Sequence, residues 1–79
     1  MKVEVHLFAT LGGYLPGGAV GDSVTLEVPE GTTVGEVSRS LEIPDDLDCL
    51  RVVNGRDVAA EHRLMDGDVV SMFPPLAGG

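Results

Sequence analysis

The sequence predicts an α+β domain of two layers, in which one helix covers one face of a small mixed sheet. Two observations lead to this prediction. Short segments of alternating apolar and polar residues, typical of strands, occur near both ends of the chain, and a segment between them has helical spacing. Because a chain of 79 residues has room for one domain, the whole of 1–79 is expected to fold as a single unit.

Two strands are expected in the first third of the chain. In "KVEVHLF", residues 2–8, the apolar residues Val3, Val5 and Leu7 share one face, and "SVTLEV", residues 23–28, alternates in the same way. The two strands are expected to pair as a hairpin. Residues 9–22 between them contain five glycines and Pro16, which predicts a long, mobile connection.

The helix is expected within "PEGTTVGEVSRSL", residues 29–41. Thr33 followed three residues later by Glu36 has the form of a capping box, which begins a helix. Apolar residues then recur at helical spacing, at Val34, Val37 and Leu41. Because the residue before a proline disfavours helical geometry, Pro44 is expected to close the helix by Ile43.

Three further strands complete the predicted sheet. The Asn54-Gly55 pair in "LRVVNGRDV" predicts a tight hairpin between two short strands, and "DVVSMF", residues 68–73, is the last strand. If the first and last strands are parallel neighbours, Phe8 and Phe73 end side by side on the face that the helix leaves open. That pair predicts a patch for docking a partner. The alternative is that residues 9–22 fold over both rings.

Charge and cysteine content exclude several classes of function. Thirteen acidic residues oppose five basic ones, giving a net charge of −8. This disfavours nucleic acid and anionic membrane surfaces as partners, and it suits either a basic protein or simply a solvated surface. The single cysteine, Cys49, cannot form an internal disulfide, so we expect a cytoplasmic protein in which Cys49 is a buried structural thiol rather than a reactive one.

No constellation for catalysis or for a bound cofactor is found in the sequence. His6 and His62 lie far apart and there is no second cysteine, so no metal site is expected. A pairing of the cysteine with a histidine as a nucleophile has no supporting motif and stays open. The glycines of residues 12–18 do not lie between a strand and a helix, so no nucleotide-binding loop is expected.

The segment "FPPLAGG", residues 73–79, is predicted to present a reactive carboxyl group to a partner. Two glycines present a slim carboxylate that fits a narrow slot, and Pro74 and Pro75 hold the preceding segment extended. A carboxylate acylates poorly until it is activated, for example as a mixed anhydride with a nucleotide phosphate. Since this chain has no residues for activation, they must come from a partner.

Four segments together resemble one known family. "DGDVVSMFPPLAGG", residues 66–79, resembles the C-terminal signature of the MoaD branch of the MoaD/ThiS ubiquitin-like sulfur carriers, and "KVEVHLFATL", "PEGTTVGEV" and "VVNGRDV" also resemble that family. The resemblance implies the β-grasp fold of ubiquitin, a mixed sheet of four to five strands with one helix on one face. It also implies an extended, flexible C-terminal tail over residues 74–79.

The resemblance implies a carrier rather than an enzyme. An E1-like enzyme would use ATP to adenylate Gly79, whose thiocarboxylate would then supply sulfur for molybdopterin synthesis. The large subunit of molybdopterin synthase, or an equivalent acceptor enzyme, would receive the tail, and Phe8 and Phe73 would dock on it. The inserted stalk would consist of Pro74, Pro75, Leu76, Ala77 and Gly78.

Three alternatives to the molybdopterin pathway stay open. Related carriers serve the tungsten cofactor, thiamin or cysteine synthesis, although the "FPP" step argues against the thiamin branch. The same activated glycine can instead modify lysines of other proteins. The third alternative is a plain binding module that uses Phe8 and Phe73 and has an idle tail.

Overall fold

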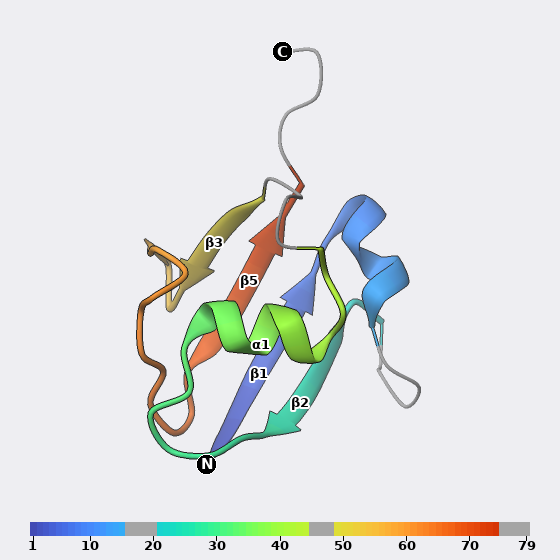
Figure 1. Cartoon of the computed structure of the whole chain (residues 1–79). Coiled ribbons are helices and arrows are strands. Elements are labelled where there is room, and N and C mark those ends of the chain that lie inside the picture. Colours follow the sequence, from blue (N-terminus) through green and yellow to red (C-terminus); the bar gives the residue numbers. More distant parts are fainter. Residues whose placement is uncertain (16–20, 45–48, 75–79) are drawn as a thin grey trace.

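The computed structural model describes residues 1–15, 21–44 and 49–74. In chain order, its elements are β1 (Lys2–Leu7), the 3-10 helix η1 (Ala9–Tyr14), β2 (Ser23–Glu27), α1 (Val34–Ser40), β3 (Leu50–Val53), β4 (Arg56–Asp57) and β5 (Val69–Phe73). The described strands form one sheet in the order β2-β1-β5-β3-β4, and α1 crosses one of its faces (Figure 1). This confirms the predicted α+β architecture.

β1 and β5 lie side by side and parallel inside the sheet, as the sequence predicts. Their register places Glu4 beside Val69 and Leu7 beside Met72. β1 also pairs with β2 as an antiparallel hairpin, and β3 pairs with β5 in the antiparallel sense. Because β1 and β5 run in the same direction, they end at the same side of the molecule, opposite the N-terminus (Figure 1).

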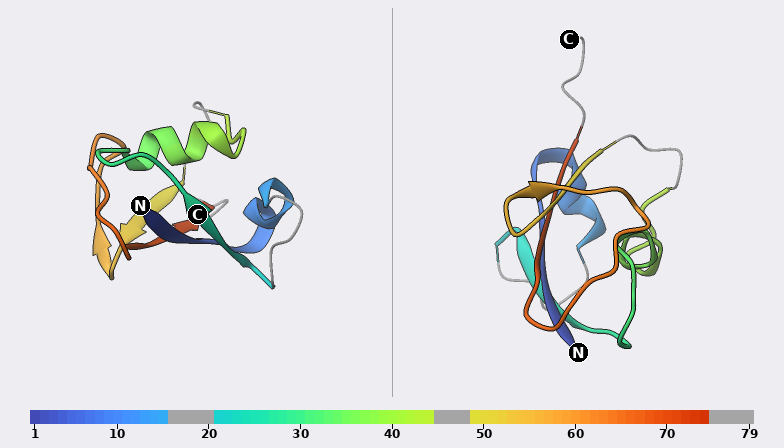
Figure 2. Two further views of the ribbon diagram at one scale, coloured as in Figure 1. Left: turned by 90° about the horizontal axis from the view of Figure 1, so that it is seen from below. Right: turned by 90° about the vertical axis from the view of Figure 1, so that its left-hand side faces the viewer.

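The core lies between the sheet and α1. Side chains alternate across a strand, so every second residue of β1 and β5 faces the helix. The fully buried side chains from these three elements are Val3, Val5, Leu7, Val34, Val37, Val70 and Met72. Figure 2 shows α1 on one side of the sheet and, in the described part of the chain, no helix across the other side. The remaining side chains of β1 and β5 therefore face outward.

The start of α1 is the capping box that the sequence predicts. The Thr33 hydroxyl accepts a hydrogen bond from the Glu36 amide at 3.2 Å, and the Thr33 amide donates to the Glu36 carboxylate at 2.9 Å. These two contacts satisfy amides that the first turn of a helix leaves unpaired. The hydrogen bond from the Thr33 backbone amide is also the main cause that lowers the pKa of Glu36 from its ordinary value.

α1 ends at Ser40, within the limit of Ile43 that the sequence predicts. Glu42 adopts a left-handed conformation with a φ of 63°. Its amide donates to the Arg39 carbonyl at 2.9 Å, and the Ile43 amide donates to the Ser38 carbonyl at 3.0 Å. This is the pattern of a Schellman motif, with the buried Ile43 as its apolar contact. The helix is thus closed by this motif before Pro44 has any effect.

The connection after β1 is more ordered than predicted. The expectation of a mobile segment over 9–22 is wrong for residues 9–14, which form η1. Leu11 is 1% exposed and belongs to the core, and its amide donates to the Phe8 carbonyl at 3.0 Å. Residues 16–20 lie outside the described part of the chain. Gly12 and Gly13 therefore do not prevent η1 from forming, because Leu11 anchors it in the core.

Asn54 does more than form the predicted turn. Asn54 and Gly55 both have positive φ, 51° and 86°, as a type I′ turn requires. In addition, the Asn54 amide group donates to the Asp68 carboxylate at 2.9 Å, and the Asn54 side-chain oxygen accepts from the Val69 amide at 3.0 Å. These bonds tie the β3–β4 turn to the start of β5.

Candidate functional site

Two aromatic rings stack on the open face of the sheet. Phe8 and Phe73 have ring centroids 4.7 Å apart and planes inclined by 7°. The centroid separation matches the spacing of about 4.8 Å between neighbouring strands, since each ring stands at the end of its own strand. Phe73 is 36% exposed and Phe8 is half-buried. The predicted juxtaposition of these two residues is confirmed.

A third apolar side chain extends this surface. Leu50, at the start of β3, pairs in register with Phe73 and is 52% exposed. Since cross-strand partners point to the same face of a sheet, Leu50 lies on the open face beside the rings. Phe8, Phe73 and Leu50 together form an apolar strip. Sequence reasoning missed Leu50, although the alternation of residues 50–53 contains the signal once the partner strand is known.

Polar residues border the apolar strip along β1. The His6 ring stacks against Phe8 at 6.0 Å, and its Nε2 is hydrogen bonded to the Glu4 carboxylate. The His6 Nδ1 lies 3.9 Å from a carboxylate oxygen of Asp22. Apolar residues in the middle and polar groups at the side are the usual anatomy of a protein interface.

The apolar strip lies where β5 gives way to the predicted tail. Phe73 is the last residue of β5, and the half-buried Pro74 follows it as the last described residue. The other predicted tail residues lie outside the described part of the chain: Pro75, Leu76, Ala77, Gly78 and Gly79. A partner bound to the apolar strip is therefore adjacent to the segment that carries the predicted chemistry.

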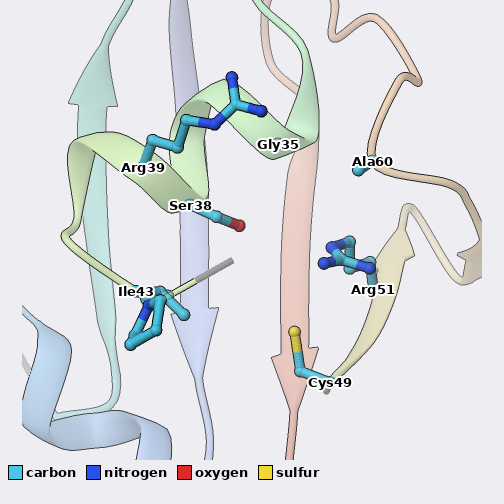
Figure 3. Close-up of a pocket in the computed structure, with 8 residues that line it drawn as sticks. Gly35, Ser38, Arg39, Ile43, Cys49, Arg51 and Ala60 are labelled. Atoms are coloured by element: carbon cyan, nitrogen blue, oxygen red, sulfur yellow. The ribbon is translucent and has the colours of Figure 1, made fainter. Parts of the chain in front are cut away.

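The structure places Cys49 at the rim of a pocket between α1 and β3 (Figure 3). This pocket has a volume of about 250 Å³, and its described lining includes Ser38, Arg39 and Arg51. The prediction of a buried thiol is corrected, because Cys49 is only half-buried while it packs against the core. No histidine is among the described lining residues, so this pocket offers no nucleophile and base pair.

Within residues 1–15, 21–44 and 49–74, no group of three or more histidine, cysteine or carboxylate side chains is placed to hold a metal ion. None of the described helices is long and apolar enough to cross a membrane. Of the described surfaces, the apolar strip has the geometry for contacting a protein partner.

Comparisons with known proteins agree with this geometry. The sequence profile of the ThiS family matches residues 5–79. Small archaeal modifier protein 3 of Haloferax volcanii is 36% identical over 97 aligned positions, which cover 100% of both chains.

Solved structures show the same architecture. The putative molybdopterin converting factor subunit 1 of Pyrococcus furiosus is 32% identical with a TM-score of 0.70, over 95% of this chain and 98% of that one. A chain in the complex of subunits 1 and 2 of the molybdopterin-converting factor from Helicobacter pylori is 25% identical with a TM-score of 0.61, over 100% of both chains.

Proposed function

The chain belongs to the ThiS family and has the ubiquitin-like β-grasp fold, and on this premise we propose that it is a sulfur carrier whose reactive group is the carboxyl of Gly79. The observation that carries this proposal is that the family match extends through Gly78 and Gly79. An E1-like enzyme adenylates the carboxyl group with ATP, and a sulfur donor then converts the acyl-adenylate into a thiocarboxylate. The chain itself is the carrier and not the catalyst.

The apolar strip is the surface by which the carrier docks on its partners. Phe73 and Leu50 are large and exposed; Phe73 directly precedes the tail, and Leu50 pairs with Phe73 across the sheet. A partner that buries both side chains receives Pro74 at the edge of the contact. Pro74 to Gly78 then form the stalk that carries Gly79 into the partner's active site, and the glycines allow passage through a narrow channel.

The sulfur acceptor in this proposal is the large subunit of a molybdopterin synthase. Two similar proteins, from Pyrococcus furiosus and Helicobacter pylori, are described as subunits of molybdopterin converting factor, and the latter was solved with its second subunit. The acceptor can be tested by mixing the thiocarboxylate form with that large subunit from the native host and the pterin precursor. Formation of molybdopterin supports the assignment, and its absence assigns the sulfur to another acceptor.

The carrier chemistry itself is tested by intact mass spectrometry of the protein from its native host. The expected species has one oxygen replaced by sulfur, and fragmentation places the sulfur on Gly79. The same measurement gives the C-terminal residue of the mature chain. A variant lacking Gly79 should show no such species and no sulfur transfer. Unchanged sulfur transfer by this variant would contradict the proposal.

A second candidate is conjugation to lysines of other proteins. The observation that favours it is the 36% identity to small archaeal modifier protein 3, which covers both chains completely. Both candidates require the same activated Gly79, and they differ in the nucleophile that attacks it. Covalent conjugates of higher mass in lysates of the native host support this second candidate. Their absence in both sulfur-rich and sulfur-poor media counts against it.

A further inference from the structure

An arginine occupies an inward-facing position of β3. The cross-strand partner of Arg51 is Met72, which is fully buried between the sheet and α1. Since cross-strand partners point to the same face of a sheet, the Arg51 side chain also lies on the helix side. The neighbouring Leu50 is exposed on the open face. At these two positions the charged residue therefore faces inward and the apolar residue outward, which reverses the usual arrangement.

The Arg51 guanidinium lacks an acceptor at one of its nitrogens. Its Nε is buried, and within the described residues this atom has no hydrogen bond. No carboxylate of the described segments forms an ion pair with Arg51, although the chain contains thirteen acidic residues. Because a guanidinium keeps its proton in proteins, burying one of its N–H groups without a partner costs free energy. A ligand that accepts from Arg51 offsets this cost.

A second donor with a poor partner lies across the pocket, on α1. Ser38 is 6% exposed, and its hydroxyl donates to the Met72 Sδ at 3.6 Å. A thioether sulfur is a weak acceptor, so this hydroxyl gains by turning to a ligand oxygen. Figure 3 shows the Ser38 hydroxyl pointing from α1 toward Arg51 on β3. Two donors from different elements thus face the same space.

The rest of the described lining also favours an anion. The pocket has a volume of about 250 Å³, and Arg39 adds a second positive charge to its wall. None of the described lining residues is acidic. In a chain with a net charge of −8, two of the five basic residues therefore border one small pocket. An oxyanion suits this lining, because it accepts charge-assisted hydrogen bonds from a guanidinium group and a hydroxyl at once.

We propose that the pocket between α1 and β3 binds a phosphate group, either as the free ion or at the end of a small phosphorylated molecule. Arg51 and Ser38 donate hydrogen bonds to the phosphate oxygens, and Arg39 attracts the anion from the pocket wall. Phosphate is preferred to a carboxylate because its oxygens point in several directions and reach both walls. The apolar strip lies on the opposite face of the sheet, so phosphate binds while a partner is docked.

Phosphate binding is tested by nuclear magnetic resonance on the full chain. Inorganic phosphate is titrated at constant ionic strength, with chloride as the ion that it replaces. The signals of the Arg51 Nε–H group and of the Ser38 amide are followed. Saturable shifts confined to residues around the pocket are expected. Shifts that chloride produces equally, or shifts centred elsewhere on the molecule, overturn the inference.

Three variants connect binding to the two donors. Arg51→Gln should raise the Kd for phosphate by about tenfold, and Ser38→Ala should raise it by a smaller factor. Arg56→Gln is the matched control, because Arg56 is an exposed arginine of β4 that does not line this pocket. Its Kd should equal that of the wild type. Equal Kd values for Arg51→Gln and Arg56→Gln overturn the inference.

Thermal unfolding provides a second measurement. A ligand that binds the folded chain raises its Tm, so phosphate should raise the Tm of the wild type and of Arg56→Gln. Arg51→Gln should gain little from phosphate, and an equal gain in this variant counts against the proposed site. If Arg51→Gln does not fold, Ser38→Ala takes its place, and its gain in Tm must be smaller than that of the wild type.

Adenosine monophosphate distinguishes the two sources of the phosphate group. If it binds more tightly than inorganic phosphate, the ligand is a phosphorylated small molecule, and the reverse order indicates the free ion. If neither binds, the inference is overturned, and Arg51 is satisfied by water or by an aspartate of residues 45–48, which lie outside the described part of the chain. None of these measurements depends on the activation of Gly79, so the inference and the proposed function are tested separately.

Discussion

At the scale of single residues, the proposed docking function depends on a few exposed apolar side chains. Phe73 and Leu50 remain exposed although the molecule is small and has few large apolar residues to bury. Phe8 supports Phe73 by stacking at 4.7 Å, which fixes the orientation of the exposed ring. Aromatic residues held in this way bind partners at a low entropic cost, and they often dominate the energy of an interface.

Replacing Phe73 with alanine should weaken binding to the activating enzyme. The loss of an aromatic anchor is expected to cost about 2 kcal/mol, or roughly thirtyfold in Kd. Calorimetric titration against the E1-like enzyme of the native host measures the Kd of each variant. Met65→Ala is the control, because Met65 is 72% exposed but lies before the start of β5, away from the apolar strip. Equal affinities for the two variants would contradict a docking role.

At the scale of elements, α1 is specified at both ends by local contacts. Its seven residues are too few to be stable alone, so the caps and the packing of Val34 and Val37 hold it in place. The N-terminal cap consists of Thr33 and Glu36, residue types that usually form a capping box. The C-terminal cap is unusual, because Glu42 adopts the left-handed conformation that glycine prefers at this position.

Glu42→Gly should stabilise the protein. Glycine adopts positive φ without the steric penalty that Glu42 incurs, and the gain is expected to be about 0.5–1 kcal/mol after the greater flexibility of the unfolded chain is subtracted. Urea denaturation measures the change. Glu30→Gly is the matched control, because Glu30 is exposed and its φ is not positive. A stability equal to or below the wild type for Glu42→Gly would contradict this account of the helix end.

The capping box should make stability depend on pH in a definite direction. Since the pKa of Glu36 is lowered in the folded state, its stabilisation is present above the unfolded pKa and is lost as the pH falls through the folded pKa. Glu36→Gln removes this titration. The difference in unfolding free energy between wild type and variant should therefore be largest at neutral pH and shrink in acid. If the difference in unfolding free energy between wild type and Glu36→Gln is constant with pH, the ionised Glu36 does not stabilise the helix start.

At the scale of the whole molecule, the net charge of −8 decides which partners approach quickly. A surface of one sign attracts partners of the other sign and raises the rate of association, and salt screens this attraction. The acidic body therefore favours a partner with a basic surface around an apolar docking site. In the proposed docking, the apolar strip then provides the contact that holds the complex together.

The association rate with the activating enzyme should fall severalfold as the salt concentration rises, while the dissociation rate changes little. Stopped-flow measurements at several ionic strengths separate the two rates. Phe73→Ala should show the opposite behaviour at fixed salt, with faster dissociation and nearly unchanged association. If the dissociation rate depends on salt concentration as steeply as the association rate, charge and not the apolar strip holds the complex together.

Much of the fold could be predicted because its signals are local. The alternation of β1 and β5, the Thr33 and Glu36 capping box and the Asn54-Gly55 turn each depend on residues a few positions apart. These signals determined the order of the elements and the side of each strand that faces the core. The outward orientation of Phe8 and Phe73, away from the core, followed from the same alternation.

The tertiary structure decided what depends on residues far apart in the sequence. Leu50 joins the apolar strip because β3 pairs with β5 in a register that places it opposite Phe73. η1 is ordered because Leu11 reaches a core built from other elements. Cys49 is half-buried because α1 and β3 leave a pocket between them. The sequence by itself determined which residues can be buried or exposed, and packing between distant segments determined which of them meet.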